Sequence, residues 1–183
     1  MSTEAADVET QALERPAASS APGEFDRLFR AQYPRIARVI ASVIRDAARA
    51  EDLAIEVFLK FWRINSGEMD KPEAWLHRVA VRKAIDDLRR QARRSRYESL
   101  FQFANHTPTP EDLRTTAEEK ERVRAVLAGV NKRDAELLLL RANELSYDEM
   151  ASALALNPAS IGTLLARAQH AFRKEYIRRY GKR

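Results

Sequence analysis

Two carboxylates, Asp52 and Glu56, lie four positions apart in a segment with the apolar spacing of a helix. Residues four apart lie on one side of a helix, so the pair could serve acid–base catalysis. No glycine-rich phosphate loop, HExxH or nucleophile elbow accompanies it. His77, His106 and His170 are isolated and lack metal-ligand spacing. We therefore expect no catalytic residue, metal or cofactor, and interpret the acidic pair as a protein-docking spot or a solvated helix face.

The densest basic stretch runs from Arg82 to Arg96 and carries seven Lys or Arg residues against Asp86 and Asp87. On a helix that also has a buried face, this density favours contacts with phosphates, whose affinity falls as salt rises through counterion release. For any one of these arginines a solvated helix face is the alternative. The cluster as a whole indicates nucleic-acid binding.

Residues 146–174 read as two helices joined by a tight turn. Ser146 followed by Glu149 fits a capping box, and Asn157 before Pro158 supplies a second helix start. This is the helix-turn-helix pattern, whose second helix enters a DNA major groove. An ordinary helical hairpin is the alternative. The apolar face of the second helix comprises Ile161, Leu164, Leu165, Ala168 and Phe172. Its candidate DNA contacts are Ser160, Thr163, Arg167, His170 and Lys174.

Aromatic residues cluster in the first half of the chain and could stack on unpaired bases. At helical spacing Phe58, Phe61 and Trp62 are better interpreted as core, whereas Trp75, next to a loop, is left open between the two roles. The loop, residues 64–71, is short and polar, which would suit reading an extruded base; otherwise it is simply a helix connection.

Composition indicates an all-α protein. The 183 residues are 45% hydrophobic, contain only five glycines and are rich in Ala, Leu, Arg and Glu. The absence of cysteine excludes disulfides and thiolate metal sites. No apolar run reaches the roughly 18 to 20 residues of a membrane span, and the acidic N-terminus does not resemble a signal peptide. We expect no membrane insertion and a cytoplasmic protein.

Charge divides the chain into alternating blocks. Residues 1–24 carry a net charge of −4, residues 25–95 carry +6, residues 96–118 carry −2 and residues 119–183 carry +5. Two basic blocks separated by an acidic segment suggest two modules that address one polyanion. The expected organisation is a disordered acidic tail (1–24), a first helical domain (25–95), a flexible linker (96–118), a helix-turn-helix domain (119–178) and a basic tail (179–183). Fully extended, the linker could span about 75 Å, so the modules could reach separate DNA sites.

Apolar periodicity places the remaining helices. One begins at Phe25 with a kink expected at Pro34, a second covers residues 50–63, and a third runs from Pro72 to about Arg94. Two more, starting near Val123 and near Arg133, precede the helix-turn-helix.

The first module resembles that of bacterial sigma factors of the extracytoplasmic-function (ECF) group. Residues 50–62, AEDLAIEVFLKFW, look like the family helix that docks on the clamp helices of RNA polymerase. The resemblance implies docking through Asp52, Ile55 and Glu56, with Ile55 standing where the family usually has glutamine. Residues 72–80 and 84–90 resemble the helix that, with the loop before it, opens and reads the minus-ten promoter element. The contacts so implied are Ser66, Trp75, Arg82, Lys83, Arg89, Arg90 and Arg93, and Arg82 stands where the family commonly has asparagine.

The second module resembles the family's helix-turn-helix for the minus-thirty-five element. Gly162, Thr163 and Arg167 match its recognition helix. Leu165, Ala166 and Phe172 sit where many members carry Lys, Ser and Arg. The resemblance covers about residues 25 to 178 and implies a dissociable subunit that binds core RNA polymerase, recognises two elements of promoter DNA and helps melt the start site. It also implies an anti-sigma factor that masks these surfaces. The alternatives are a free-standing helix-turn-helix regulator and, more remotely, a helical interaction protein with no DNA role.

Overall fold

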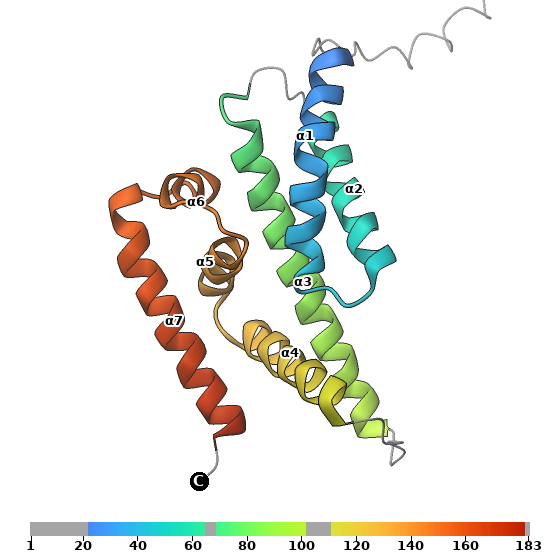
Figure 1. The fold of residues 1–183 in the computed structure, drawn as a ribbon, viewed down its shortest axis with the longest axis vertical. Coiled ribbons are helices and arrows are strands. Elements are labelled where there is room, and N and C mark those ends of the chain that lie inside the picture. The colour runs from blue at the N-terminus through green and yellow to red at the C-terminus, as the bar shows by residue number, and fades with distance from the viewer. Residues whose placement is uncertain (1–21, 65–68, 102–110, 182–183) are drawn as a thin grey trace, which may run out of the picture.

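The fold is entirely helical over the part of the chain that the structure describes. A computed structural model describes the backbone of residues 22–64, 69–101 and 111–181, and the side chains of residues 23–64, 69–95 and 117–181. Within these ranges the chain forms seven helices (Figure 1). They are α1 (Pro22–Ala41), α2 (Ala47–Arg63), α3 (Pro72–Phe101), α4 (Glu111–Gly129), α5 (Lys132–Ala142), α6 (Tyr147–Leu154) and α7 (Pro158–Tyr180). The all-α prediction is confirmed.

Helices α1, α2 and α3 pack together as the first module. Asp46 begins α2 by accepting a hydrogen bond from the amide of Arg49 at 3.1 Å. Pro34 lies inside α1 without ending it. Ile40, Phe58 and Leu76, one from each helix, are buried, so each helix contributes its apolar face to one core.

Helices α4 to α7 form the second module, and its local signals behave as predicted. Ser146 and Glu149 form the capping box at the start of α6, with Ser146 Oγ accepting from the Glu149 amide at 3.2 Å and Glu149 Oε2 accepting from the Ser146 amide at 2.8 Å. Asn157 caps α7 by accepting from the amide of Ala159 at 3.0 Å, and Pro158 occupies the first turn. The helix-turn-helix expected at residues 146–174 is therefore present.

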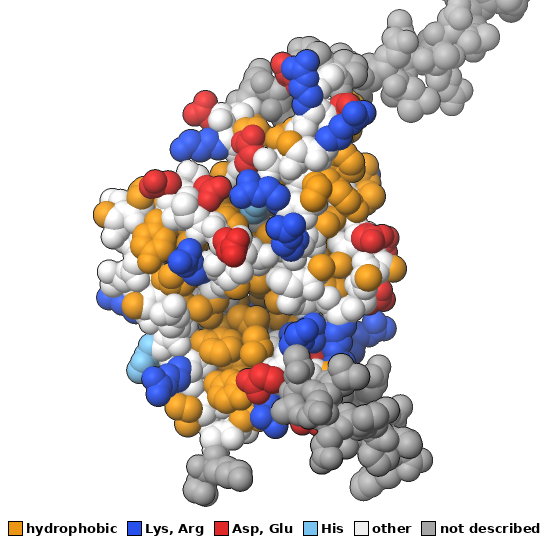
Figure 2. Space-filling view, in the orientation of Figure 1, with side chains coloured by type: hydrophobic (Ala, Val, Ile, Leu, Met, Phe, Trp, Pro, Cys, Tyr) orange, Lys and Arg blue, Asp and Glu red, His pale blue; other side chains and the backbone are white. Residues whose placement is uncertain are grey.

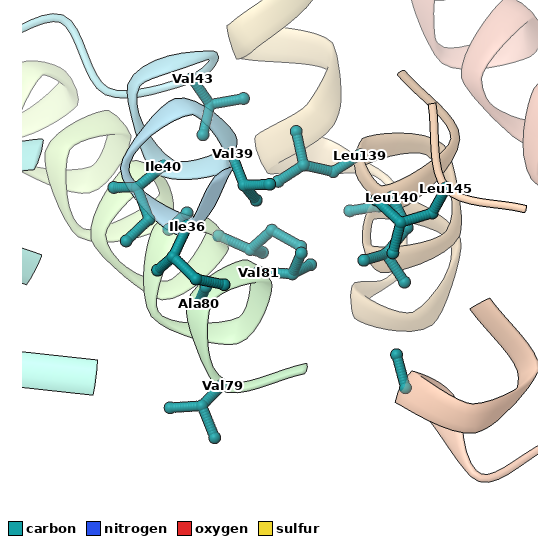
Figure 3. Packing of buried hydrophobic residues seen from close by; sticks show 14 of the residues in the cluster. Ile36, Val39, Ile40, Val43, Val79, Ala80, Val81, Leu139, Leu140 and Leu145 are labelled. Carbon is teal, nitrogen blue, oxygen red and sulfur yellow. The ribbon is translucent and has the colours of Figure 1, made fainter. Parts of the chain in front are cut away.

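The two modules are packed against each other along α3, which contacts α4, α5 and α6. Their buried side chains form one continuous core. In Figure 3, Val39 of the first module lies beside Leu139 of the second, and Val81 lies on the side of α3 that faces Leu140 and Leu145. The sequence suggested two modules that could reach separate DNA sites. In the structure the two modules instead share one apolar interface.

Two expectations about the first module were wrong in detail. Helix α3 does not end near Arg94 but continues to Phe101. Trp62 is not a core residue: 48% of its surface is exposed, whereas Phe58 and Phe61 are buried as expected. Trp62 lies three residues beyond Leu59 on the outward side of α2, which the apolar composition of that helix concealed. No helix within the described ranges is long and apolar enough to cross a membrane.

Candidate protein and nucleic-acid interfaces

The outward side of α2 presents an acidic residue beside an apolar stripe. Asp52 is exposed, and Ile55, Leu59 and Trp62 follow at steps of four and three residues, each with 45–48% of its surface exposed. Residues at these steps share one side of a helix. Three large apolar side chains aligned on a charged surface are typical of a protein-docking site. Leu59 and Trp62 were not among the predicted docking residues.

Glu56 stands beside this stripe but is held by basic residues of its own module. Its carboxylate accepts a hydrogen bond from the Lys83 ammonium and pairs with Arg49 at 3.5 Å. The Lys83 ammonium holds the pKa of the Glu56 carboxyl below its ordinary value, partly opposed by burial. Of the three predicted docking residues, Asp52 and Ile55 are therefore open to a partner, whereas Glu56 already has partners.

Near the start of α3, Trp75 packs within the first module and keeps part of its surface exposed. Its ring lies 5.5 Å from that of Phe61, and its side chain is half-buried. Ser66, the other predicted contact near this end of α3, lies outside the described residues.

Four of the predicted DNA-binding cations of α3 are held by groups of the protein itself. Lys83 pairs with Glu56 and Arg90 with Asp87, both within the first module. The other two point to the second module: Arg82 Nε lies 3.3 Å from Glu136 Oε1 of α5, and Arg89 Nη2 donates to the Val130 carbonyl at 2.7 Å. Arg93 is exposed. Most of the cations predicted to bind DNA through α3 are therefore engaged with other groups of the protein in this arrangement.

Asp87 fixes α2 to α3 from within this basic region. It is 4% exposed and accepts hydrogen bonds from Arg49, Arg90 and Gln91. A buried carboxylate requires such partners because burial disfavours its charge. In the sequence, Asp87 is one of two acidic residues within the basic stretch from Arg82 to Arg96, and no local pattern indicates that it is buried.

The outward face of α7 is open along most of its length. Thr163, Arg167, His170 and Lys174 are exposed as the helical period predicted. Ser160 is half-buried, and its hydroxyl donates to the Asn157 carbonyl at 2.7 Å, so it also stabilises the first turn of the helix. The predictions omitted Arg173, which is exposed three residues after His170.

Buried residues on the opposite side hold α7 in place. Ile161, Leu165 and Ala168 are 0–5% exposed, and α7 packs against α4, α5 and α6. The outward residues are thus presented by a rigid helix rather than by a loop, as a reader of the major groove requires. Within the described residues, no group of three or more His, Asp or Glu side chains is placed to hold a metal ion.

A three-helix bundle with exposed acidic and apolar side chains on α2, followed by a helix-turn-helix, is the arrangement of a sigma-class transcription initiation factor, and the comparisons with known proteins agree with it. Residues 28–94 match the family described as Sigma-70 region 2. Over 146 residues the chain is 30% identical to the ECF RNA polymerase sigma factor SigK of Mycobacterium ulcerans, a match that covers 76% of each chain. The chain belongs to the ECF family of RNA polymerase sigma factors, which direct transcription initiation and are not enzymes.

Solved structures share the fold at lower identity. CnrH, in complex with the cytosolic domain of CnrY, is 20% identical, with a TM-score of 0.53 over 86% of this chain and 90% of that one. The sigma factor RpoE, in complex with the anti-sigma factor NepR from Bartonella quintana, is 19% identical, with a TM-score of 0.50 over 83% and 96% of the two chains.

Proposed function

We propose that this sigma factor docks on core RNA polymerase through the outward side of α2. The observation that carries this assignment is the exposed stripe of Ile55, Leu59 and Trp62 beside Asp52. Apolar side chains would supply the buried area, and the Asp52 carboxylate would meet a basic group of the polymerase. Glu56 contributes only if the partner displaces Lys83 and Arg49 from it.

Promoter recognition is divided between the two modules. Helix α3 and the loop before it contact the minus-ten element through Trp75, Arg82, Lys83, Arg89, Arg90 and Arg93, together with Ser66. Helix α7 contacts the minus-thirty-five element through Ser160, Thr163, Arg167, His170 and Lys174, to which its exposure adds Arg173. In this division α7 anchors the protein on phosphates and sets its register. Melting falls to α3.

An anti-sigma factor masks the surfaces that meet polymerase and promoter DNA. The protein works in the cytoplasm, together with the polymerase. Two related folds were solved in complex with CnrY and NepR. In this chain, apolar residues remain exposed beyond the docking stripe: Ile177 is 56% exposed and Tyr180 is 39% exposed. On the face shown in Figure 2, apolar side chains gather over the region where α4 and α7 lie. Such a surface fits a protein partner better than it fits DNA.

Reversal of the charge at Asp52 tests the docking assignment. Asp52→Arg should abolish co-purification with core polymerase and promoter-dependent transcripts, while far-ultraviolet circular dichroism stays unchanged. Glu144→Arg is the matched control, because Glu144 is also exposed but lies in the second module, away from α2. Equal co-purification of Asp52→Arg and the wild type would remove Asp52 from the docking face.

A further inference from the structure

A cavity of about 290 Å³ lies at the junction of α1, the start of α3 and α6. Its lining includes His77 and Leu145, which are only 5% and 3% exposed, and exposed charged side chains surround them. Figure 2 shows basic and acidic side chains intermixed over the region where α6 and the first turns of α3 lie. Concave sites with a few convergent polar groups are typical of small-molecule binding, and this volume suits a ligand smaller than a drug.

Two cations at the edge of the cavity are only weakly engaged. Lys71 Nζ donates to the Ser152 hydroxyl at 3.3 Å, and no carboxylate of the described residues pairs with it. Arg35 Nη2 lies 3.8 Å from Glu149 Oε1, and both side chains are about half exposed. An exposed pair at this distance contributes little to stability, so Arg35 and Lys71 are both available to an anionic group of a ligand.

Carboxylates without partners line the same cavity. Glu73 and Asp148 are exposed, and within the described part of the chain neither carboxylate forms an ion pair. Glu149 differs from them because it caps α6, accepting from the Ser146 amide at 2.8 Å. This bond holds the pKa of the Glu149 carboxyl below its ordinary value. Glu73 and Asp148 are therefore the two acids that remain to accept from a cationic group of a ligand.

His77 adds a neutral acceptor to the lining. Its Nδ1 lies 2.9 Å from the Glu73 carbonyl oxygen, which can only accept, so Nδ1 carries a hydrogen. Burial lowers the pKa of His77 below its ordinary value, so the ring is neutral at pH 7. In that form Nε2 is an acceptor, and it can receive a hydrogen bond from a ligand.

We propose that this cavity binds a small zwitterion of the free amino-acid class, with its carboxylate on Arg35 and Lys71 and its ammonium on Glu73 and Asp148. A ligand with only an anionic group would leave the two acids unmatched, and one with only a cationic group would leave the two cations unmatched. No lining residue belongs to the exposed stripe of α2 or to the outward face of α7. The site is therefore additional to the surfaces proposed for polymerase and for upstream DNA.

Calorimetric titration of the full chain with each standard L-amino acid tests the site. We expect at least one of them to bind with a Kd below about 1 mM. It should also raise the melting temperature as its concentration rises, because it binds the folded chain only. The matched probes for that amino acid are the acid that lacks its amino group and the amine that lacks its carboxylate. Each probe should bind at least about tenfold more weakly.

Two variants assign the two halves of the ligand. Lys71→Met and Asp148→Asn each remove one charge from the edge of the cavity at nearly constant size, and each should weaken binding by about tenfold. Lys120→Met and Glu144→Gln are the controls, because they remove exposed charges that do not line the cavity. All four positions are exposed, so far-ultraviolet circular dichroism should be unchanged, and both controls should bind like the wild type.

Three results would overturn the proposal. The first is no binding by any standard amino acid up to about 10 mM. The second is equal binding by the acid or by the amine, which would contradict the zwitterionic class of the ligand. The third is unchanged affinity in both Lys71→Met and Asp148→Asn, which would place the bound amino acid outside this cavity.

Discussion

Arg167 lies on the outward face of α7, and within the described residues no carboxylate pairs with it. Three exposed cations, Arg167, Arg173 and Lys174, lie within two turns on this face. If each meets one phosphate of the upstream element, each adds about 0.9 to the slope of log affinity against log salt, and the three together add about 2.7. Arg167→Ala should therefore lower the slope by about 0.9. The ratio of wild-type affinity to Arg167→Ala affinity for the upstream duplex should therefore fall by roughly 3.5-fold between 50 and 200 mM salt.

Arg178 provides a matched control on the same helix. It donates to Glu175 through Nε at 2.7 Å and Nη2 at 2.6 Å, and Arg179 donates to the same carboxylate. These guanidiniums, Arg178 first, lower the pKa of Glu175 to about 2, so the acid is charged at any working pH. Because Arg178 is already paired, Arg178→Ala should leave the slope close to that of the wild type.

The assay is fluorescence anisotropy of an upstream-element duplex, titrated with each protein at several salt concentrations. A slope for Arg167→Ala equal to the wild-type slope would mean that Arg167 is only solvated surface. An equal loss of slope for Arg178→Ala would show that pairing within α7 does not decide which arginines meet phosphate.

The remaining predictions concern stability and are measured by urea unfolding. Ser146→Ala removes half of the capping box of α6 and should lower the free energy of unfolding by about 1 kcal/mol. Ala155 ends α6 with a left-handed φ of 54°, so Ala155→Gly should raise that free energy by about 0.5–1 kcal/mol. Leu140 is fully buried between the modules, and Leu140→Ala should cost about 2–5 kcal/mol. Burial lowers the pKa of His77 below its ordinary 6.5, so stability should fall as pH drops from above 6.5 toward the lower folded pKa, and His77→Gln should remove this dependence.

Each of these predictions has a result that would contradict it. An unchanged urea midpoint for Ser146→Ala would mean that the capping box is not formed in solution, and a lower one for Ala155→Gly would mean that chain entropy outweighs Cβ strain. A cost for Leu140→Ala of less than about 1 kcal/mol would indicate that the module interface is loosely packed. For His77, replacement of the exposed His170 by Gln is the control, and it should leave the pH dependence intact.

Helix positions were largely predictable because their signals are local. The capping residues of α6 and α7 were predicted correctly, since Ser146 and Asn157 cap amides only two or three positions away. The apolar period likewise identified Ile161, Leu165 and Ala168 as buried and the cations of α7 as exposed. The end of α3 was not predicted, because no proline or glycine follows Arg94 closely enough to stop a helix.

Some site residues could likewise be predicted from local signals, and others could not. Exposure of Asp52 and Ile55 on one side of α2 follows from helical spacing alone. The exposure of Trp62 does not, because a large apolar residue in an amphipathic helix belongs to the core or to a docking face according to what lies next to it.

By itself the sequence determined the local signals of seven helices, the all-α class and the two basic modules. It also carried a family resemblance that the comparisons confirm. Only the tertiary structure decided which charges are free. Arg82 and Glu136 are 54 positions apart, and nothing local in either segment indicates the other. Hydrogen bonding and apolar period act over a few residues, so they can be read along the chain. The pairing of charges depends on which surfaces meet, and that is settled only when the two modules pack.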